Sequence, residues 1–373
     1  MGMKTRLLFP LVLLFLAAAC EDEQPNPGPD PVSGVDLSEL DYAPEDYDLV
    51  VPENYRVFPM SAENPMTVQG VELGRHLFYD KRLSSDGSQS CASCHMPAGS
   101  FTDNRAVSVG VEGNAGVRSS MPILDLVYVK NGLFWDGRAP NLEVQAIEPV
   151  EDPVELFEDW DNVLAKLRAE KLYHRLFREA FGIHNSDEIS RDLATRAIAQ
   201  FERSIVTSGQ SKYDRFVNGD PTVLNDAEIR GLELFFDEVQ PDAECGHCHA
   251  PPLFTTNEFI NNGIEDVESL EDFPDRGRGD VTGQLFDNGK FRVPTLRNIE
   301  LTAPYMHDGR FATLEEVMEH YNSGVHFTAN LDPNVKPDGL GLSEQNISDV
   351  IAFMKALTDT QVTTDPRYQN PFE

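Results

Sequence analysis

Basic side chains are scarce in this sequence of 373 residues. Lysine and arginine number 30 against 63 aspartates and glutamates, which gives a formal net charge of −33. A surface this acidic repels nucleic-acid phosphates and anionic lipid head groups. The charge therefore excludes nucleic-acid binding and favours basic or neutral protein partners. The apolar fraction of 40% is ordinary for a globular protein, so the charge does not imply disorder.

The N-terminal apolar run is too short to span a bilayer. It covers residues 7–19, whereas a spanning helix needs about 20 residues. Lys4 and Arg6 precede it, and small residues end it before Cys20, a pattern typical of a signal peptide at 1–19. We expect an exported bacterial lipoprotein, periplasmic or outer-membrane-attached, that meets the membrane only through lipid on Cys20. Plain secretion with a stray cysteine is the alternative.

Length and composition predict the division of the remaining chain. Residues 20–44 are acidic and rich in proline at their start, which predicts an extended, solvated tether. At about 150 residues per domain the rest allows two domains. We place them at 45–187 and 188–361, followed by a tail at 362–373.

Cysteine is also rare, and its placement is informative. Apart from Cys20, all the cysteines lie in two Cys-x-x-Cys-His runs, Cys91-Ala-Ser-Cys94-His95 and Cys245-Gly-His-Cys248-His249. This pattern is the attachment signature of c-type haem, in which two thiols bond to the porphyrin and the histidine binds iron. A disulfide framework leaves the histidines unexplained, and a four-cysteine zinc site needs two distant pairs to converge. The sequence predicts two haems.

Several further motifs occur twice in the same order. Each haem motif follows Gly-x-x-Leu-Phe-aromatic-Asp (from Gly74 and from Gly231) and precedes Phe-Thr-x-Asn (from Phe101 and from Phe254). A Pro-x-Leu then precedes Trp135-Asp-Gly-Arg in the first half and His307-Asp-Gly-Arg in the second, with the same spacing. Repeats of this size predict an internal duplication.

The apolar spacing predicts a helical protein with long loops. Helical periodicity covers residues 68–79, 163–181, 189–206, 227–236, 314–321 and 347–357. Between these helices lie long glycine- and proline-rich stretches, where haem supplies the missing core. The predicted fold class is all-α, with two cytochrome-c-like haem domains related by duplication.

Three segments resemble the bacterial di-haem cytochrome c peroxidase and MauG family. They are Phe78 to His95, Phe134-Trp-Asp-Gly-Arg-Ala139, and Pro294-Thr-Leu-Arg-Asn-Ile-Glu-Leu-Thr-Ala-Pro-Tyr-Met-His-Asp-Gly309. The resemblance implies that the first haem, on Cys91, Cys94 and His95, reacts with hydrogen peroxide. It also implies that the second haem, on Cys245, Cys248 and His249, relays electrons.

The same resemblance assigns three residues around the first haem. Trp135 matches a tryptophan that passes charge between the haems, although a plain core tryptophan is the commoner case. Gln145 and Glu155 match a pair above the reactive iron, where a carboxylate moves the proton of bound peroxide. Glu155 also lies in an acidic run (Glu148, Glu151, Asp152 and Glu158), so a solvated surface is the alternative.

Two departures from the family pattern concern the iron ligands. Classical members of the family carry a histidine that blocks the reactive iron until the second haem is reduced; here the sequence is Ser108-Val-Gly-Val111, which implies an open iron. For the second haem, the peroxidases place a methionine where this chain has Tyr321, the MauG-type ligand. An anionic phenolate favours higher oxidation states of iron than methionine does. The alternatives are that Tyr321 only packs, or that Met318 is the ligand.

Calcium is a further expectation from the family. Thr302 and Pro304 match backbone positions that bind calcium between the domains, but the matching asparagine is missing. Ser120 is the substitute oxygen ligand in this segment.

These observations lead to a main hypothesis with two rivals. We expect a di-haem enzyme of MauG-like ligation that reacts with peroxide and oxidises a small redox protein (a cytochrome c or cupredoxin) or a protein substrate. The first rival is a conventional, reductively activated cytochrome c peroxidase; the second is a pure electron carrier. A homodimer is left open.

Overall fold

The structure, a computed structural model, describes residues 1–2, 34–53, 55, 62–236 and 244–373. The chain divides into two units, Met1–Gly34 and Val35–Glu373. The expected signal peptide, Cys20 and most of the expected tether lie outside the described residues. Within the described part, no helix combines the length and apolarity that crossing a membrane requires.

The unit Val35–Glu373 is mostly helical, which confirms the predicted helical class. Its α-helices are α1 (Val68–Tyr79), α2 (Cys91–Cys94), α3 (Leu142–Gln145), α4 (Glu148–Glu151), α5 (Trp160–Arg168), α6 (Lys171–Phe181), α7 (Arg191–Ser204), α8 (Lys212–Val217), α9 (Asp226–Phe235), α10 (Arg278–Thr282), α11 (Leu314–Ser323), α12 (Glu344–Lys355) and α13 (Gln361–Thr364). Two short strands, β1 (Phe259–Ile260) and β2 (Phe291–Arg292), pair antiparallel.

Local capping explains where the main helices begin. The side chains of Thr67, Ser190 and Ser343 each accept a hydrogen bond from a backbone N–H in the first turn of α1, α7 and α12. Asn225 and Glu228 form a capping box at the start of α9. The helix expected over 163–181 is two helices, because the chain breaks between α5 and α6 at Ala169 and Glu170.

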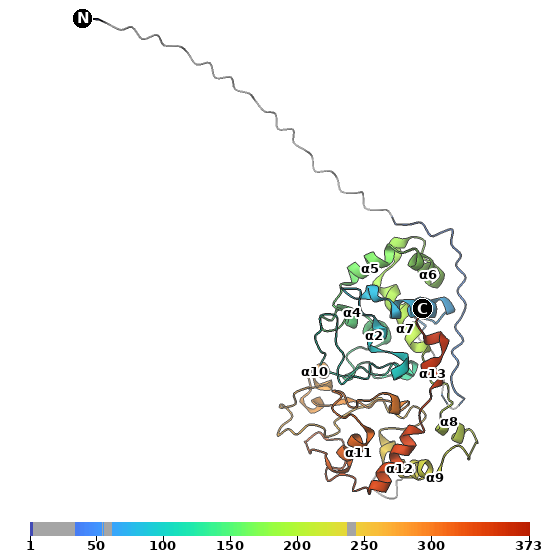
Figure 1. Ribbon diagram of the computed structural model, residues 1–373, viewed down its shortest axis with the longest axis vertical. Helices are drawn as coiled ribbons and strands as arrows, with labels where there is room; N and C mark the ends of the chain where they lie inside the picture. The colour runs from blue at the N-terminus through green and yellow to red at the C-terminus, as the bar shows by residue number, and fades with distance from the viewer. Residues whose placement is uncertain (3–33, 54, 56–61, 237–243) are drawn as a thin grey trace. The chain divides into compact units, whose positions relative to one another are not determined.

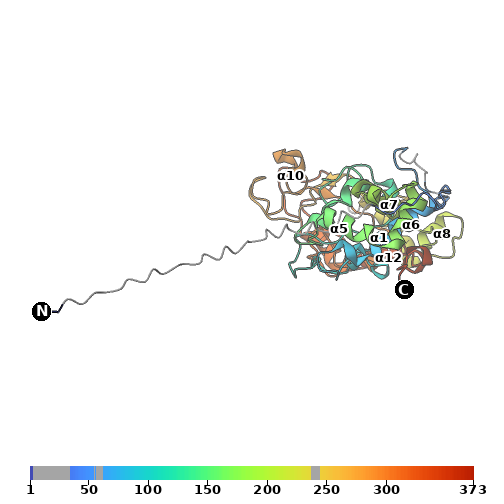
Figure 2. The ribbon, with the colours of Figure 1, turned by 90° about the horizontal axis from the view of Figure 1, so that it is seen from above.

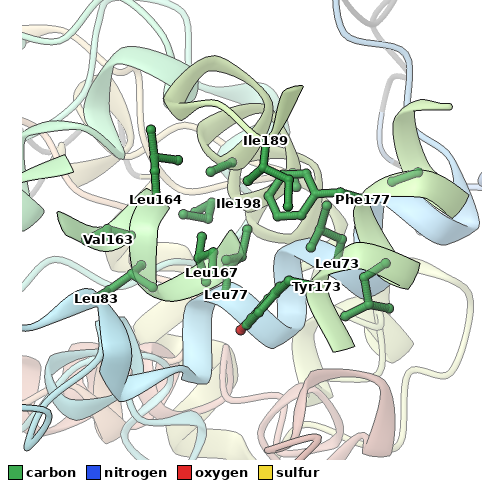
Figure 3. Packing of buried hydrophobic residues seen from close by; sticks show 14 of the residues in the cluster. Leu73, Leu77, Leu83, Val163, Leu164, Leu167, Tyr173, Phe177, Ile189 and Ile198 are labelled. Carbon is green, nitrogen blue, oxygen red and sulfur yellow. The ribbon is translucent and has the colours of Figure 1, made fainter. Parts of the chain in front are cut away.

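The first core cluster draws on α1, α5, α6 and α7. Its side chains include Leu73, Leu77, Leu83, Val163, Leu164, Leu167, Tyr173, Phe177, Ile189 and Ile198 (Figure 3). Because α7 contributes to this cluster, the packing of the first half extends beyond the boundary expected at residue 187.

The C-terminal segment returns to the first half of the chain. Val362 and Tyr368 are buried against Phe78, Phe101 and Phe201, and Figure 1 shows α13 and the C-terminus beside α7. The segment expected as a tail at 362–373 is therefore packed against the first half. The second half has its own cluster, in which residues of α9, α11 and α12 surround Phe254.

Two helix pairs pack through a glycine. A Cβ on Gly74 of α1 would overlap the Ala197 carbonyl oxygen of α7 and press on Phe201. A Cβ on Gly231 of α9 would overlap the Asp349 carbonyl oxygen of α12 and press on Phe353. Both glycines are therefore required for the close approach of two helix backbones.

We predict that Gly74→Ala destabilises the protein by about 1–3 kcal/mol, because an overpacked contact forces α1 and α7 apart. The measurement is the thermal unfolding midpoint of the haem-loaded protein. Gly116→Ala is the matched control, since its Cβ would lie 3.7 Å from the nearest atom, the Ser108 oxygen. Equal midpoints for the two variants would contradict the prediction.

Candidate functional site

The first haem motif holds its histidine in a fixed orientation. His95 follows α2, and its Nδ1 lies 2.9 Å from the Phe101 carbonyl oxygen and 3.2 Å from the Ser120 hydroxyl. Burial lowers the pKa of His95, so the ring is neutral and carries one N–H. With that hydrogen on Nδ1, the lone pair on Nε2 is available to a metal.

The second haem motif repeats this arrangement. The Nδ1 of His249 lies 3.0 Å from the Phe254 carbonyl oxygen, and burial lowers the pKa of His249 as well. Phe101 and Phe254 both adopt left-handed backbone conformations, with φ of 64° and 54°. Each phenylalanine turns its carbonyl toward the histidine of its own motif.

The cysteines are arranged for two separate sites. No disulfide joins Cys91, Cys94, Cys245 or Cys248 in the described part of the chain. Cys91 packs on the cluster around Phe101, whereas Cys245 packs on the cluster around Phe254. This separation argues against the four-cysteine zinc site and against the disulfide framework.

The second histidine opens onto a cavity. Its walls are largely apolar and include Ile260, Phe291, Leu296, Val317 and Met354. Haem is flat and largely apolar, so an apolar cavity suits it. The neutral histidine can bind its iron, and the two thiols beside the histidine can attach its porphyrin. These residues fit a c-type haem.

Tyr321 lines this cavity together with His249. The Asn262 amide donates to the Tyr321 hydroxyl at 3.3 Å, and burial raises the pKa of Tyr321 to about 12. Met318 is only 4% exposed, belongs to the core cluster and is not part of the cavity wall. Tyr321 thus shares the cavity wall with His249, and Met318 does not.

Met306 is a cavity residue that the sequence analysis did not identify. It lies in a left-handed turn with φ of 73°, and its sulfur is 3.6 Å from the same Asn262 amide. The motif register predicts a ligand on the helix after His307, and it gives no signal for a methionine on the loop before that helix.

Trp135 shares a cavity with His249 and is hydrogen-bonded to the segment that contacts the first haem motif. It forms part of the cavity wall, and its indole N–H donates to the Ser119 carbonyl at 2.9 Å. The next residue, Ser120, donates from its hydroxyl to the Cys94 carbonyl at 2.8 Å. A short path of bonds and hydrogen bonds therefore connects Trp135 with the first haem motif.

Gln145 ends α3, and Glu155 lies on the loop after α4, close enough to the first motif that its charge adds to the effect of burial, which raises the pKa of Cys91 and Cys94. Both side chains are half-buried. Burial raises the pKa of Glu155 to about 7, and the charges of Asp152 and Glu148 act in the same direction. Glu155 can therefore exchange a proton near neutral pH.

The other carboxylates of this acidic run differ from Glu155. Glu158 forms an ion pair with Lys166, which lowers its pKa, and Glu148 pairs with Arg138 at 2.7 Å. Glu151 is exposed to solvent.

The segment that replaces the family's blocking histidine packs directly on Glu155. The Val111 N–H donates to the Glu155 carbonyl at 2.9 Å. A Cβ on Gly110 would overlap the carbonyl oxygens of Val154 and Glu155. Val111 has no group that can ligate iron.

The three expected calcium residues all line the cavity. The Ser120 hydroxyl donates to a backbone carbonyl as described above, and Thr302 donates to the Ile299 carbonyl at 3.2 Å. Calcium binding by Ser120, Thr302 and Pro304 stays a prediction.

Glu202 on α7 is a buried acid that the sequence analysis missed. Its side chain is 3% exposed, and its Oε2 has no hydrogen-bond partner among the described residues. Burial raises its pKa to about 8. The neighbouring Arg203 is held by both oxygens of Glu143 on α3, at 2.7 and 2.8 Å, so it does not neutralise Glu202 fully.

We predict that Glu202 makes the folded protein less stable as pH rises. Its pKa is higher in the folded state than the ordinary glutamate value, so its contribution is present at acidic pH and lost as pH rises through about 8. The thermal midpoint of Glu202→Gln should fall less between pH 5 and pH 9 than that of the unmodified protein. The control is Glu233→Gln on the exposed side of α9; parallel curves for all three proteins would refute the prediction.

Comparison with known proteins identifies the family. A family model described as di-haem cytochrome c peroxidase matches residues 68–222. The cytochrome c551 peroxidase of Nitrosomonas europaea is 36% identical over 84% of this chain and 86% of its own length. The methylamine utilization protein MauG of Methylorubrum extorquens is 35% identical over 80% and 81%.

A solved structure agrees with these relatives. The crystal structure of a MauG-like protein associated with microbial copper homeostasis superimposes with a TM-score of 0.77 at 35% identity, covering 88% of this chain and 100% of that one. The sequence resemblance is thereby confirmed: this chain belongs to the di-haem cytochrome c peroxidase and MauG family of oxidoreductases, whose members carry two c-type haems.

Proposed function

We propose that this protein is a di-haem peroxidase or oxidase that reacts with hydrogen peroxide at the first haem and passes electrons through the second, with MauG-like ligation. The observation that carries the proposal is the pair of half-buried histidines, each oriented by a phenylalanine carbonyl beside two cysteines. When bound, the haems supply iron that binds peroxide and exchanges electrons.

The two haem domains are proposed to derive from an internal duplication. Supporting this, the helix contacts at Gly74 and Gly231 have the same construction. The loops after the two motifs also agree, since Asn104 and Asn257 are both left-handed, with φ of 54° and 59°.

Glu155 is proposed to act as the proton carrier at the first haem. With a pKa of about 7 it can accept a proton from peroxide and return it to the departing oxygen. Gln145, at the end of the adjacent short helix, is the proposed hydrogen-bonding partner of the same oxygen atoms. Val111, which is hydrogen-bonded to the Glu155 carbonyl, would supply no competing ligand to the iron of the first haem.

Trp135 is proposed to carry charge between the haems. The Trp135 ring borders the cavity of the second histidine, and its N–H donates to the Ser119 carbonyl. The next residue, Ser120, donates to the Cys94 carbonyl in the first motif. A buried indole in this place divides one long electron transfer into two shorter steps.

Tyr321 is proposed as the second ligand of the second haem. Its place on the cavity wall with His249 supports this role, and the Asn262 amide can stabilise the phenolate that forms on binding iron. The electron donor or protein substrate then reacts at this haem. Calcium at Ser120, Thr302 and Pro304, and export as a lipoprotein through Cys20, belong to the same proposal.

The deciding experiment adds one equivalent of hydrogen peroxide to the fully ferric protein and follows both irons by low-temperature EPR. We expect both ferric signals to decrease together, because the first iron is open and the haems share the oxidising equivalents. If neither signal changes until the second haem is reduced, the protein is a conventional, reductively activated peroxidase. If neither changes under any condition, it is an electron carrier.

We predict that Tyr321→Phe raises the reduction potential of the second haem, because a phenolate stabilises ferric iron. The measurement is a spectroelectrochemical titration. Met318→Leu, one turn earlier on α11, is the matched control and should leave the potential unchanged. A shift in the Met318 variant instead would identify methionine as the ligand.

We predict that the peroxide reaction of the ferric protein accelerates as pH rises through about 7, because deprotonated Glu155 accepts the proton. Glu155→Gln should slow this step by about 10²–10⁴-fold and remove the pH dependence. Stopped-flow spectra at several pH values measure both effects. Glu151→Gln, exposed on α4, is the control; a pH profile that persists in Glu155→Gln would exclude this role.

A further inference from the structure

Arg118 links the two halves of the chain beside Trp135. It lies on the loop region after the first haem motif, and its guanidinium donates to both carboxylate oxygens of Asp275, each at 2.8 Å. The remaining nitrogen, Nη1, donates to the Asp136 carboxylate at 2.6 Å. Asp275 lies three residues before α10, which Figure 2 shows at the edge of the folded unit. One side chain therefore binds a carboxylate from each half.

These ion pairs are largely shielded from water. The side chains of Arg118, Asp136 and Asp275 are 17%, 6% and 25% exposed. Burial by itself would raise the pKa of Asp275, but the hydrogen bonds and the charge of Arg118 lower it below its ordinary value. A guanidinium that binds a carboxylate through two nitrogens fixes its direction as well as its distance. A lysine amine is a single point of charge and cannot replace this arrangement.

The segment that contains Arg118 also fixes the indole of Trp135. The next residue, Ser119, accepts the indole N–H with its carbonyl oxygen at 2.9 Å. Two neighbouring residues, Arg118 and Ser119, thus hold two others, Asp136 and Trp135. The second half contributes the backbone N–H of Arg292, which donates to the Trp135 carbonyl at 2.8 Å. The orientation of the indole therefore depends on both halves.

Ser119 also connects this segment with the cavity that His249 lines. Its N–H donates to the His307 carbonyl at 2.7 Å, and its hydroxyl donates to the Met306 carbonyl at 2.9 Å. His307 and Met306 both line that cavity. A shift of the segment would therefore move the indole relative to the cavity wall.

The neighbouring arginines do not duplicate the link made by Arg118. Arg138 pairs with Asp136 and Glu148, which both belong to the first half. Arg278 donates to the backbone carbonyls of Asp136 and Gly137. Among these described arginines, Arg118 alone pairs with carboxylates of both halves.

We infer that Arg118 is a positioning residue for electron transfer, which fixes the Trp135 indole by joining Asp136 to Asp275 of the second half. The inference rests on the proposed function, in which one electron passes from the second haem through Trp135 to the first haem, where hydrogen peroxide is the oxidant. A displacement of about 1 Å can slow a positioned reaction by about 10²-fold. Loss of the Arg118 contacts should therefore slow this electron transfer and leave haem attachment unchanged.

The test adds one equivalent of hydrogen peroxide to the haem-loaded, fully ferric protein and follows both ferric signals by rapid-freeze EPR. In Arg118→Gln the signal of the first haem should decay at the unmodified rate. The signal of the second haem should decay about tenfold or more slowly. Arg118→Lys should restore little of this rate, and Asp275→Asn, which removes the link from the other side, should show the same slowing.

Ultraviolet resonance Raman spectra supply a readout of the indole itself, because the indole bands respond to the hydrogen bond of the N–H. The Trp135 band should shift toward that of a free N–H in Arg118→Gln. The protein has two tryptophans, and the N–H of the other, Trp160, donates to the Ile147 carbonyl, away from Arg118. An unshifted band would contradict the positioning role.

Arg230→Gln is the matched control, because Arg230 binds both carboxylate oxygens of Asp349 at 2.7 and 2.8 Å within the second half. Equal slowing in this control, an unchanged second signal in Arg118→Gln, or full recovery in Arg118→Lys would overturn the inference. Trp135→Phe separates it from the proposed function. If the second signal decays at the full rate in Trp135→Phe, charge does not pass through Trp135 and the proposed function itself fails.

Discussion

A hydrogen bond from an imidazole N–H to a backbone carbonyl sets the geometry on which both proposed haem sites depend. His95 and His249 each use Nδ1 for this bond, which leaves Nε2 for iron. The acceptors, Phe101 and Phe254, must adopt a left-handed backbone that costs of order 1–3 kcal/mol. Full burial of both phenylalanine rings in the core offsets this cost, so the haem sites and the hydrophobic clusters stabilise each other.

Local signals made much of this fold predictable from the sequence. The helix expected at 68–79 is α1, because its apolar spacing coincides with a capping threonine directly before it. The expected helix at 163–181 was wrong as a single element. Helical spacing of apolar residues continues across Ala169 and Glu170, and neither residue is a glycine or proline that would mark the break. Motif register likewise singled out Trp135 and Tyr321, and both line the cavity of the second histidine.

The features that could not be predicted depend on contacts between distant segments. In the sequence Phe201-Glu-Arg203, nothing distinguishes Glu202 from an exposed helix residue. It is buried because α7 packs against other segments of the chain. The return of Tyr368 to the first half is equally non-local, since its hydroxyl donates to the Ser204 carbonyl at 2.7 Å. Periodicity and motif spacing carry no information about such pairings.

The distribution of acidic groups separates proton transfer from electron transfer. The first site has Glu155, whose pKa of about 7 allows proton exchange. Among the described residues, the wall of the cavity that His249 lines contains neither aspartate nor glutamate. Reducing peroxide consumes protons, whereas passing an electron through a haem need not. A carboxyl near one haem and an apolar wall around the other therefore favour peroxide chemistry at the first and electron exchange at the second, independently of the motif order.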